Sequence, residues 1–133
     1  MNHSIITLDN FYHDADLVRE FALQQEYSVG GNYPGKRTQS FKEGQVMEGF
    51  EEMLGFEIDK DHWNASEYTG CFQSVTGDRP HWIHADPHDD YAAVIFLTPD
   101  PPLQTGTSFY RHKKSKSIRA NIVKGFKDKE STK

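Results

Sequence analysis

The sequence predicts an α+β protein in which N-terminal helices pack on a mainly antiparallel β layer. Two stretches with apolar residues at helical spacing occupy the first part of the chain, and short stretches typical of strands follow from residue 64. Strands and helices do not alternate along the chain, which argues against a parallel sheet. A length of 133 residues is expected to give one domain with a modest core.

Two segments carry the pattern of amphipathic helices. Residues 14–27 (DADLVREFALQQEY) have Asp14 as the expected N-cap and an apolar face made of Leu17, Val18, Phe21 and Ala22. Residues 44–58 (GQVMEGFEEMLGFEI) end at Gly55, and their apolar stripe consists of Val46, Met47, Phe50, Met53 and Leu54. We interpret this stripe as core rather than as part of a cofactor site.

The remaining elements are predicted to be short strands. A first strand is expected at residues 4–11, and a loop rich in Gly and Pro at 30–35 leads into a short extended piece that ends near residue 41. The later strands are expected at 65–75, 81–85, 91–98 and 107–112. Turn residues separate them, so an antiparallel arrangement follows.

Charge divides the chain near residue 110. Residues 1–110 hold 6 Lys and Arg against 18 Asp and Glu, whereas residues 111–133 hold 9 against 2. The last segment has few large apolar residues, so we predict a basic, flexible, solvated tail, with contact to nucleic acid as the alternative.

Several classes of protein are excluded or disfavoured. The single cysteine, Cys71, cannot form an intramolecular disulfide and is interpreted as a small core residue rather than a nucleophile. The chain has no P-loop and no G-x-G-x-x-G motif. No apolar run reaches the length of a membrane span, and the first residues lack a signal-peptide pattern. A cytoplasmic protein without membrane contact is therefore expected.

The stretch HWIHADPHDDY (residues 81–91) is the strongest candidate for a metal site. In an extended segment residues i and i+2 project to the same side, so His84 and Asp86 are expected to point together. One imidazole and one carboxylate are two thirds of the facial triad that binds Fe(II) and leaves positions open. The neighbouring His81, His88, Asp89 and Asp90 are interpreted as solvated loop residues, with a substitute ligand as the alternative. Zinc is disfavoured because no Cys pair or H-E-x-x-H spacing occurs.

The stretch WIHADPHDDYAAVIFLTPDPPLQTGTSFYRH resembles the first half of the core in iron(II)- and 2-oxoglutarate-dependent dioxygenases of the prolyl-hydroxylase-like branch. The similarity covers about residues 4–112 and is closest to small members from phages and marine bacteria. It implies N-terminal helices on a double-stranded β-helix of the jelly-roll or cupin type. It also implies Fe(II) and 2-oxoglutarate as cofactors, His84 and Asp86 as iron ligands, and Tyr91 as a residue lining the cosubstrate pocket.

Other positions match the resemblance in part. Gly106 and Thr107 match the start of a strand that shapes the barrel wall, and Arg37 with Thr38 lies in the N-terminal block shared with the relatives. The family pattern then requires a distal histidine and a basic residue that pairs with 2-oxoglutarate. His112 and Arg119 do not have the expected spacing. The resemblance therefore implies an incomplete β-helix in this chain, whose C-terminal strands are missing.

The expected organisation is an oxygenase-like domain at 1–110, with a helical part at about 1–60 and a β core at about 64–110, followed by the tail at 111–133. Two functions stay open. The first is a hydroxylase-type oxygenase, truncated and inactive as this chain, with a pocket that includes Trp82 and Phe96. The second is a non-catalytic protein-binding module, as in phage–host interaction, which associates with a partner or with itself through exposed strand edges.

Overall fold

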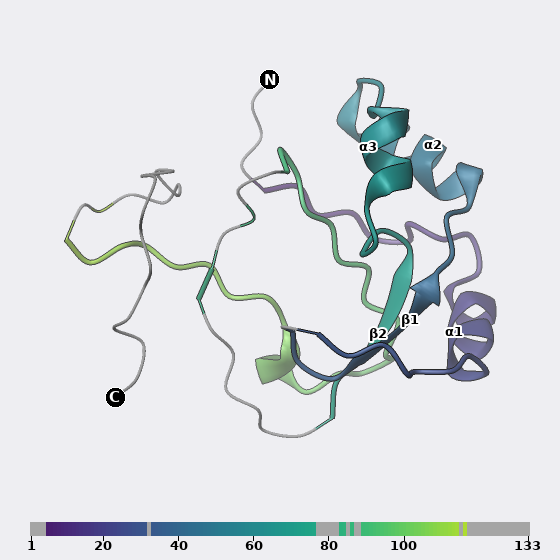
Figure 1. The fold of residues 1–133 in the computed structure, drawn as a ribbon. Helices are drawn as coiled ribbons and strands as arrows, with labels where there is room; N and C mark the ends of the chain where they lie inside the picture. Colours follow the sequence, from purple (N-terminus) through teal and green to yellow (C-terminus); the bar gives the residue numbers. More distant parts are fainter. Residues whose placement is uncertain are drawn as a thin grey trace. The chain divides into compact units, whose positions relative to one another are not determined.

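Three helices and two strands form the described part of the chain, so the α+β class is confirmed. The computed structural model describes residues 5–31, 33–76, 83–84, 86, 89–114 and 116. The elements are α1 (Ala15–Leu23), β1 (Lys36–Ser40), α2 (Gly44–Leu54), α3 (Lys60–Ala65), β2 (Cys71–Ser74) and a 3-10 turn (Leu103–Thr105) (Figure 1). The chain divides into two units, Met1–Arg79 and Pro80–Lys133, and each is considered by itself.

A bulge interrupts the pairing of the two antiparallel strands. Arg37 lies opposite Gln73, but Ser40 lies opposite Cys71, so Thr38 and Gln39 together face Phe72 alone. The hydroxyl of Thr38 compensates for the broken ladder, because it accepts a hydrogen bond from the Phe72 N–H at 3.1 Å and donates to the Gln39 carbonyl at 2.7 Å. Thr38 is only 1% exposed. A buried backbone donor is thereby satisfied at the bulge.

Helix α1 begins as the sequence predicts, but its predicted apolar face is packed only in part, because Ala22 is buried whereas Leu17 is 65% exposed. Asp14 is its N-cap, and the Asp14 carboxylate accepts a hydrogen bond from the Leu17 N–H at 2.9 Å. The Phe21 ring contacts the rings of Phe41 and Phe72 at centroid distances of 5.2 and 6.0 Å. These three rings attach α1 to the strands, since Phe72 belongs to β2 and Phe41 directly follows β1.

Helices α2 and α3 lie side by side in Figure 1 and share an aromatic cluster. The Phe50 ring of α2 lies 4.7 Å from the Phe11 ring and 6.2 Å from the Trp63 ring of α3, centroid to centroid. Gly55 ends α2 with a φ of 75°, a conformation that favours glycine. The predicted stripe of α2 is half-buried along its whole length, in agreement with the packing role.

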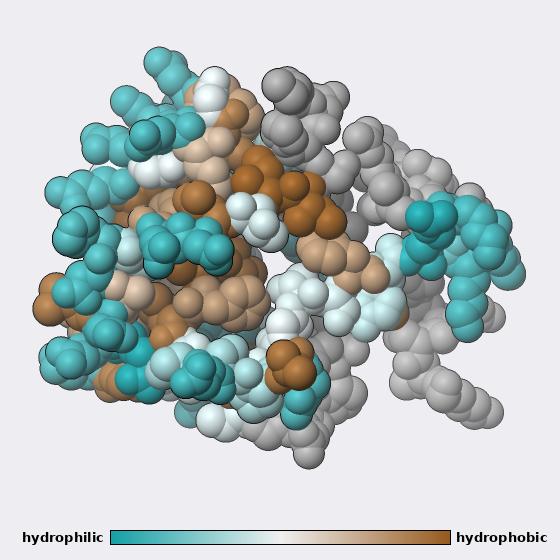
Figure 2. Space-filling view, turned by 180° about the vertical axis from the view of Figure 1, so that it is seen from behind, coloured by the Kyte–Doolittle hydropathy of each residue, from teal (hydrophilic) through white to brown (hydrophobic). Residues whose placement is uncertain are grey.

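Few described side chains are removed completely from solvent. Ala22 and Thr38 are the buried residues among those that the structure describes. Even Phe21, which contacts two other rings, is 45% exposed. Figure 2 shows apolar side chains open on the surface among polar ones, rather than covered by them. Contacts between ring edges and faces therefore contribute more to packing than a closed aliphatic core does.

One prediction for the first unit was wrong, and one helix was not predicted. Residues 5–11 of the expected first strand form no strand; Asn10 has a φ of 58°, which is incompatible with an extended run. Helix α3 was missed, and its last turn overlaps the start of the strand expected at 65–75. Its signal is the Asp59 cap, whose carboxylate accepts hydrogen bonds from the N–H groups of Asp61 and His62.

The described residues of the second unit do not form the expected strands. Residues 91–98 and 107–112 adopt no strand, and the 3-10 turn is the one regular element among the described residues from 83 onward. Strand-forming composition requires a partner edge, and none pairs with these two stretches within the described residues. Most of the strand expected at 81–85 and the end of the chain lie outside the described residues. The double-stranded β-helix and the boundary near residue 110 stay predictions.

A search of the described residues finds no helix that is long and apolar enough to cross a membrane.

Replacement of Thr38 by Val is expected to lower the free energy of unfolding by about 1–3 kcal/mol, because the isosteric side chain leaves the Phe72 N–H without its acceptor. Urea denaturation measures the change. Thr7→Val is the matched control, since Thr7 is exposed, and its cost should stay within about 0.5 kcal/mol. Equal losses in the two variants would contradict the role of the Thr38 hydroxyl.

Candidate functional site

His84 and Asp86 lie together, as their spacing predicts. The Nε2 atom of His84 is 3.7 Å from the Oδ1 atom of Asp86, a distance longer than a hydrogen bond. Their side chains are 55% and 51% exposed. No strand includes His84 or Asp86 in the described residues.

The pair fits two neighbouring positions on a divalent ion. Donor atoms on adjacent octahedral positions, each about 2.1 Å from the metal, lie about 3 Å apart. The observed 3.7 Å is about 0.7 Å longer than that separation. A third ligand is not found beside the pair. Among the described residues, no three His, Cys, Asp or Glu side chains come together in a group that could hold an ion.

The other residues that the sequence singles out for this site are only partly described by the structure. Asp89, Asp90 and Tyr91 are described and exposed, and Tyr91 is 42% accessible. His81, Trp82 and His88 lie outside the described residues, as does Arg119. His112, Gly106 and Thr107 are exposed in the second unit. The expectation that Tyr91 lines a cosubstrate pocket stays a prediction.

A second polar constellation, which the sequence did not reveal as a site, surrounds Arg37 on β1. Its guanidinium carbon lies 3.8 Å from the Tyr33 ring centroid and 4.8 Å from that of Tyr68. The two rings meet at an interplanar angle of 83°. Arg37 Nε donates a hydrogen bond to Gln73 Oε1 at 2.8 Å. The guanidinium thus lies in a corner between two ring faces, with its Nε edge held by the opposite strand.

Turn geometry produces this corner. Gly35 has a φ of 75°, and a Cβ atom there would overlap the carbonyl oxygen of Ser74, so the turn before β1 requires glycine. The turn carries Tyr33 back beside the strand, where its hydroxyl donates to the Val29 carbonyl at 3.2 Å. Sequence signals for the cluster exist only in part. The Pro34-Gly35 turn and the two tyrosines are visible in the sequence, but whether the tyrosines meet depends on strand pairing.

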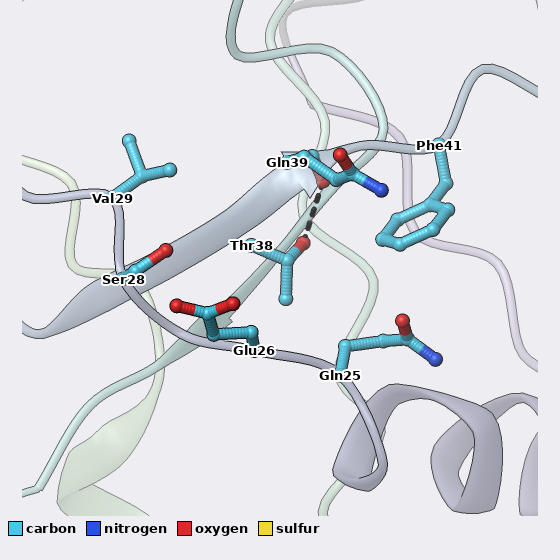
Figure 3. A pocket seen from close by; sticks show the side chains of 7 residues that line it. All are labelled: Gln25, Glu26, Ser28, Val29, Thr38, Gln39 and Phe41. Atoms are coloured by element: carbon cyan, nitrogen blue, oxygen red, sulfur yellow. Dashed lines mark hydrogen bonds between the residues drawn. The ribbon is translucent and has the colours of Figure 1, made fainter.

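A hollow of about 180 Å³ in the first unit is lined mainly by polar residues: Gln25, Glu26, Ser28, Val29, Thr38, Gln39 and Phe41. Figure 3 shows that the side chains of Gln25 and Glu26 extend away from each other. The Thr38 hydroxyl is used by the bulge. Because these polar groups do not converge, the hollow does not form a catalytic set.

Cys71 has the character of a structural thiol. Its Sγ donates to the Glu67 carbonyl at 3.2 Å, and burial raises the pKa of the thiol, while the positive charges of Arg37 and Lys42 act in the opposite direction. A raised pKa reduces the thiolate that a nucleophile requires. The half-buried position agrees with the interpretation as a packing residue.

Comparison with known proteins finds one family. A family model described as "Family of unknown function (DUF6445)" matches residues 1–130. No curated protein matches the chain. No solved structure matches it.

Replacement of Arg37 by Gln should slow modification of Cys71 by a disulfide reagent at pH 8. Loss of the positive charge raises the pKa of the thiol further, so less thiolate is present at that pH. The decrease should be less than about tenfold, because half-exposed charges interact weakly. Lys36→Gln removes a charge from the same strand and is the control. An unchanged or faster reaction of the Arg37 variant would contradict the placement of this charge.

Proposed function

The chain belongs to the family of unknown function DUF6445, and we propose that it binds a divalent metal ion of the Fe(II) type through His84 and Asp86. The observation that carries this proposal is the approach of His84 Nε2 to Asp86 Oδ1 at 3.7 Å within an H-x-D sequence. Both side chains are about half exposed, so an ion from solvent can reach the donor atoms. An imidazole and a carboxylate are donors that suit Fe(II).

The resemblance in residues 4–112 supports a further step, an oxygenase of the hydroxylase type that uses 2-oxoglutarate. When bound, the ion would supply the activation of oxygen. In this proposal His84 and Asp86 hold two positions, and a distal histidine from outside this chain provides the third. Tyr91, exposed and a few residues beyond the pair, borders the cosubstrate. The double-stranded β-helix belongs to the same proposal.

Metal titration tests the proposal directly. Co(II), which gives visible absorption bands in nitrogen and oxygen sites, is titrated into the protein under anaerobic conditions, and Fe(II) competes with it. His84→Ala and Asp86→Asn should each weaken binding at least about tenfold, because each removes one of the two proposed donors. Asp90→Asn, at an exposed carboxylate of the same segment, should leave affinity within about twofold.

Turnover separates metal binding from the oxygenase. With Fe(II), 2-oxoglutarate and oxygen, formation of succinate that depends on His84 supports the enzyme. Binding of Co(II) without succinate formation contradicts the oxygenase for this chain and leaves the metal site. Absence of binding in the unsubstituted protein contradicts both.

Exposed apolar side chains in the second unit favour a second candidate function, association with a protein partner or another copy of the chain. Phe109 is 71% exposed and Leu103 fully exposed, and Val94, Phe96 and Tyr110 are similarly accessible. A hollow of about 280 Å³ is lined by Phe96, Pro101, Pro102, Leu103, Thr105 and Gly106. Phe96 and Leu103 both line this hollow, and exposed apolar side chains that form a patch are typical of interaction surfaces.

Light scattering tests this second candidate with the metal-free protein. Self-association should raise the weight-average mass as concentration rises, and Phe109→Ser should shift the dissociation constant upward about tenfold or more, since a large exposed ring is lost. Ile5→Ser, at an apolar residue of the first unit that is 57% exposed, is the control. A mass equal to one chain at every concentration would exclude self-association through this surface.

A further inference from the structure

The side chain of Arg37 is only half-buried, yet several contacts hold its guanidinium in place. Arg37 and Gln73 are a cross-strand pair, and both the N–H and the C=O of Arg37 bond to Val29 on the other side. The pair is therefore of the non-hydrogen-bonded type, in which side chains approach most closely. Gln73 is itself held, because its Nε2 donates to the Pro34 carbonyl at 2.8 Å.

The remaining donors of Arg37 are its two terminal nitrogens. Nε is used by Gln73, and the guanidinium carbon lies 3.8 and 4.8 Å from the ring centroids of Tyr33 and Tyr68. Within the described residues no carboxylate lies within 4 Å of these nitrogens. The aromatic rings contribute attraction to the cation but accept no strong hydrogen bond from its edge.

We propose that the Nη1 and Nη2 atoms of Arg37 bind an oxyanion, a carboxylate or a phosphate group, in the corner formed by Tyr33 and Tyr68. Two neighbouring oxygens match the planar fork of a guanidinium, and such bidentate pairs are the strongest hydrogen bonds of this kind. Gln73 and the rings already order the Arg37 side chain. Binding of a ligand therefore costs less conformational entropy, and the affinity for the ligand is higher. Tyr68, 64% exposed, forms the wall on the solvent side.

This site is independent of the metal proposal. All of its residues belong to the unit Met1–Arg79, whereas His84 and Asp86 belong to the unit Pro80–Lys133. Binding of an oxyanion in the presence of a chelator therefore tests the Arg37 site alone.

The experiment is a titration of the ¹⁵N-labelled full chain with inorganic phosphate and, in a second series, with acetate, at constant ionic strength and with a chelator present. The Arg37 Nε–H resonance and the amide resonances of the strands report binding. Saturable shifts centred on Arg37 are expected with at least one probe. Preference for phosphate or for acetate identifies which oxyanion the corner accepts.

Three variants give the experiment its controls. Arg37→Lys keeps the charge but lacks the fork, and it should weaken binding about tenfold. Tyr68→Leu removes one wall at an exposed position and should weaken binding about threefold. Lys36→Gln removes a charge from the neighbouring exposed residue and should change affinity by less than about twofold. Amide spectra of each variant establish that it is folded; should Arg37→Lys unfold, Tyr68→Leu carries the test.

The outcomes decide the proposal. Saturable binding that is lost in Arg37→Lys or reduced in Tyr68→Leu, and kept in Lys36→Gln, supports it. Absence of saturation with both probes overturns it and leaves Arg37 with a purely structural role. Equal weakening in Arg37→Lys and Lys36→Gln also overturns it, because the attraction would then come from the general charge of the surface.

Discussion

The hydroxyl of Thr38 is the contact on which the arrangement of the first unit depends. It lies where two residues of β1 face Phe72 alone, and it satisfies the Phe72 N–H that the bulge leaves without a strand partner. The bulge divides β1 into two parts that pair with β2 in different register. Before it, Arg37 lies opposite Gln73. After it, Ser40 lies opposite Cys71, and the Phe41 N–H bonds to the carbonyl of Gly70, which precedes β2. A shift in this register would move side chains to opposite faces.

Aromatic contacts carry the packing around this sheet. Phe21, Phe41 and Phe72 join α1 to the strands, and Phe50 with Phe11 and Trp63 joins α2 to α3. Because few described side chains are fully buried, each ring keeps part of its surface in water. Such a unit gains stability from many partly buried contacts, so the polar contacts at Thr38 and at the helix caps contribute a large share.

The two candidate sites use different chemistry. His84 and Asp86 present an imidazole and a carboxylate from a single short segment, an arrangement suited to a cation. Arg37 presents hydrogen-bond donors from a corner that three separate segments build, an arrangement suited to an anion. A local motif requires only extended backbone to bring its groups together, whereas the corner at Arg37 requires the turn at Gly35, the strand pair and the segment that carries Tyr68.

The sequence by itself determined the local features: α1 with its Asp14 cap, α2 with its Gly55 end, the extended piece at β1 and the approach of His84 to Asp86. Each depends on residues within a few positions of one another, where period, capping and i, i+2 spacing apply. Composition also favoured strands at 91–98 and 107–112, but a strand forms only with a partner edge, and composition does not specify one. Only the tertiary structure decided the bulge at Thr38 and the meeting of Arg37 with Tyr33 and Tyr68, because these contacts join distant segments through a register that no single segment encodes.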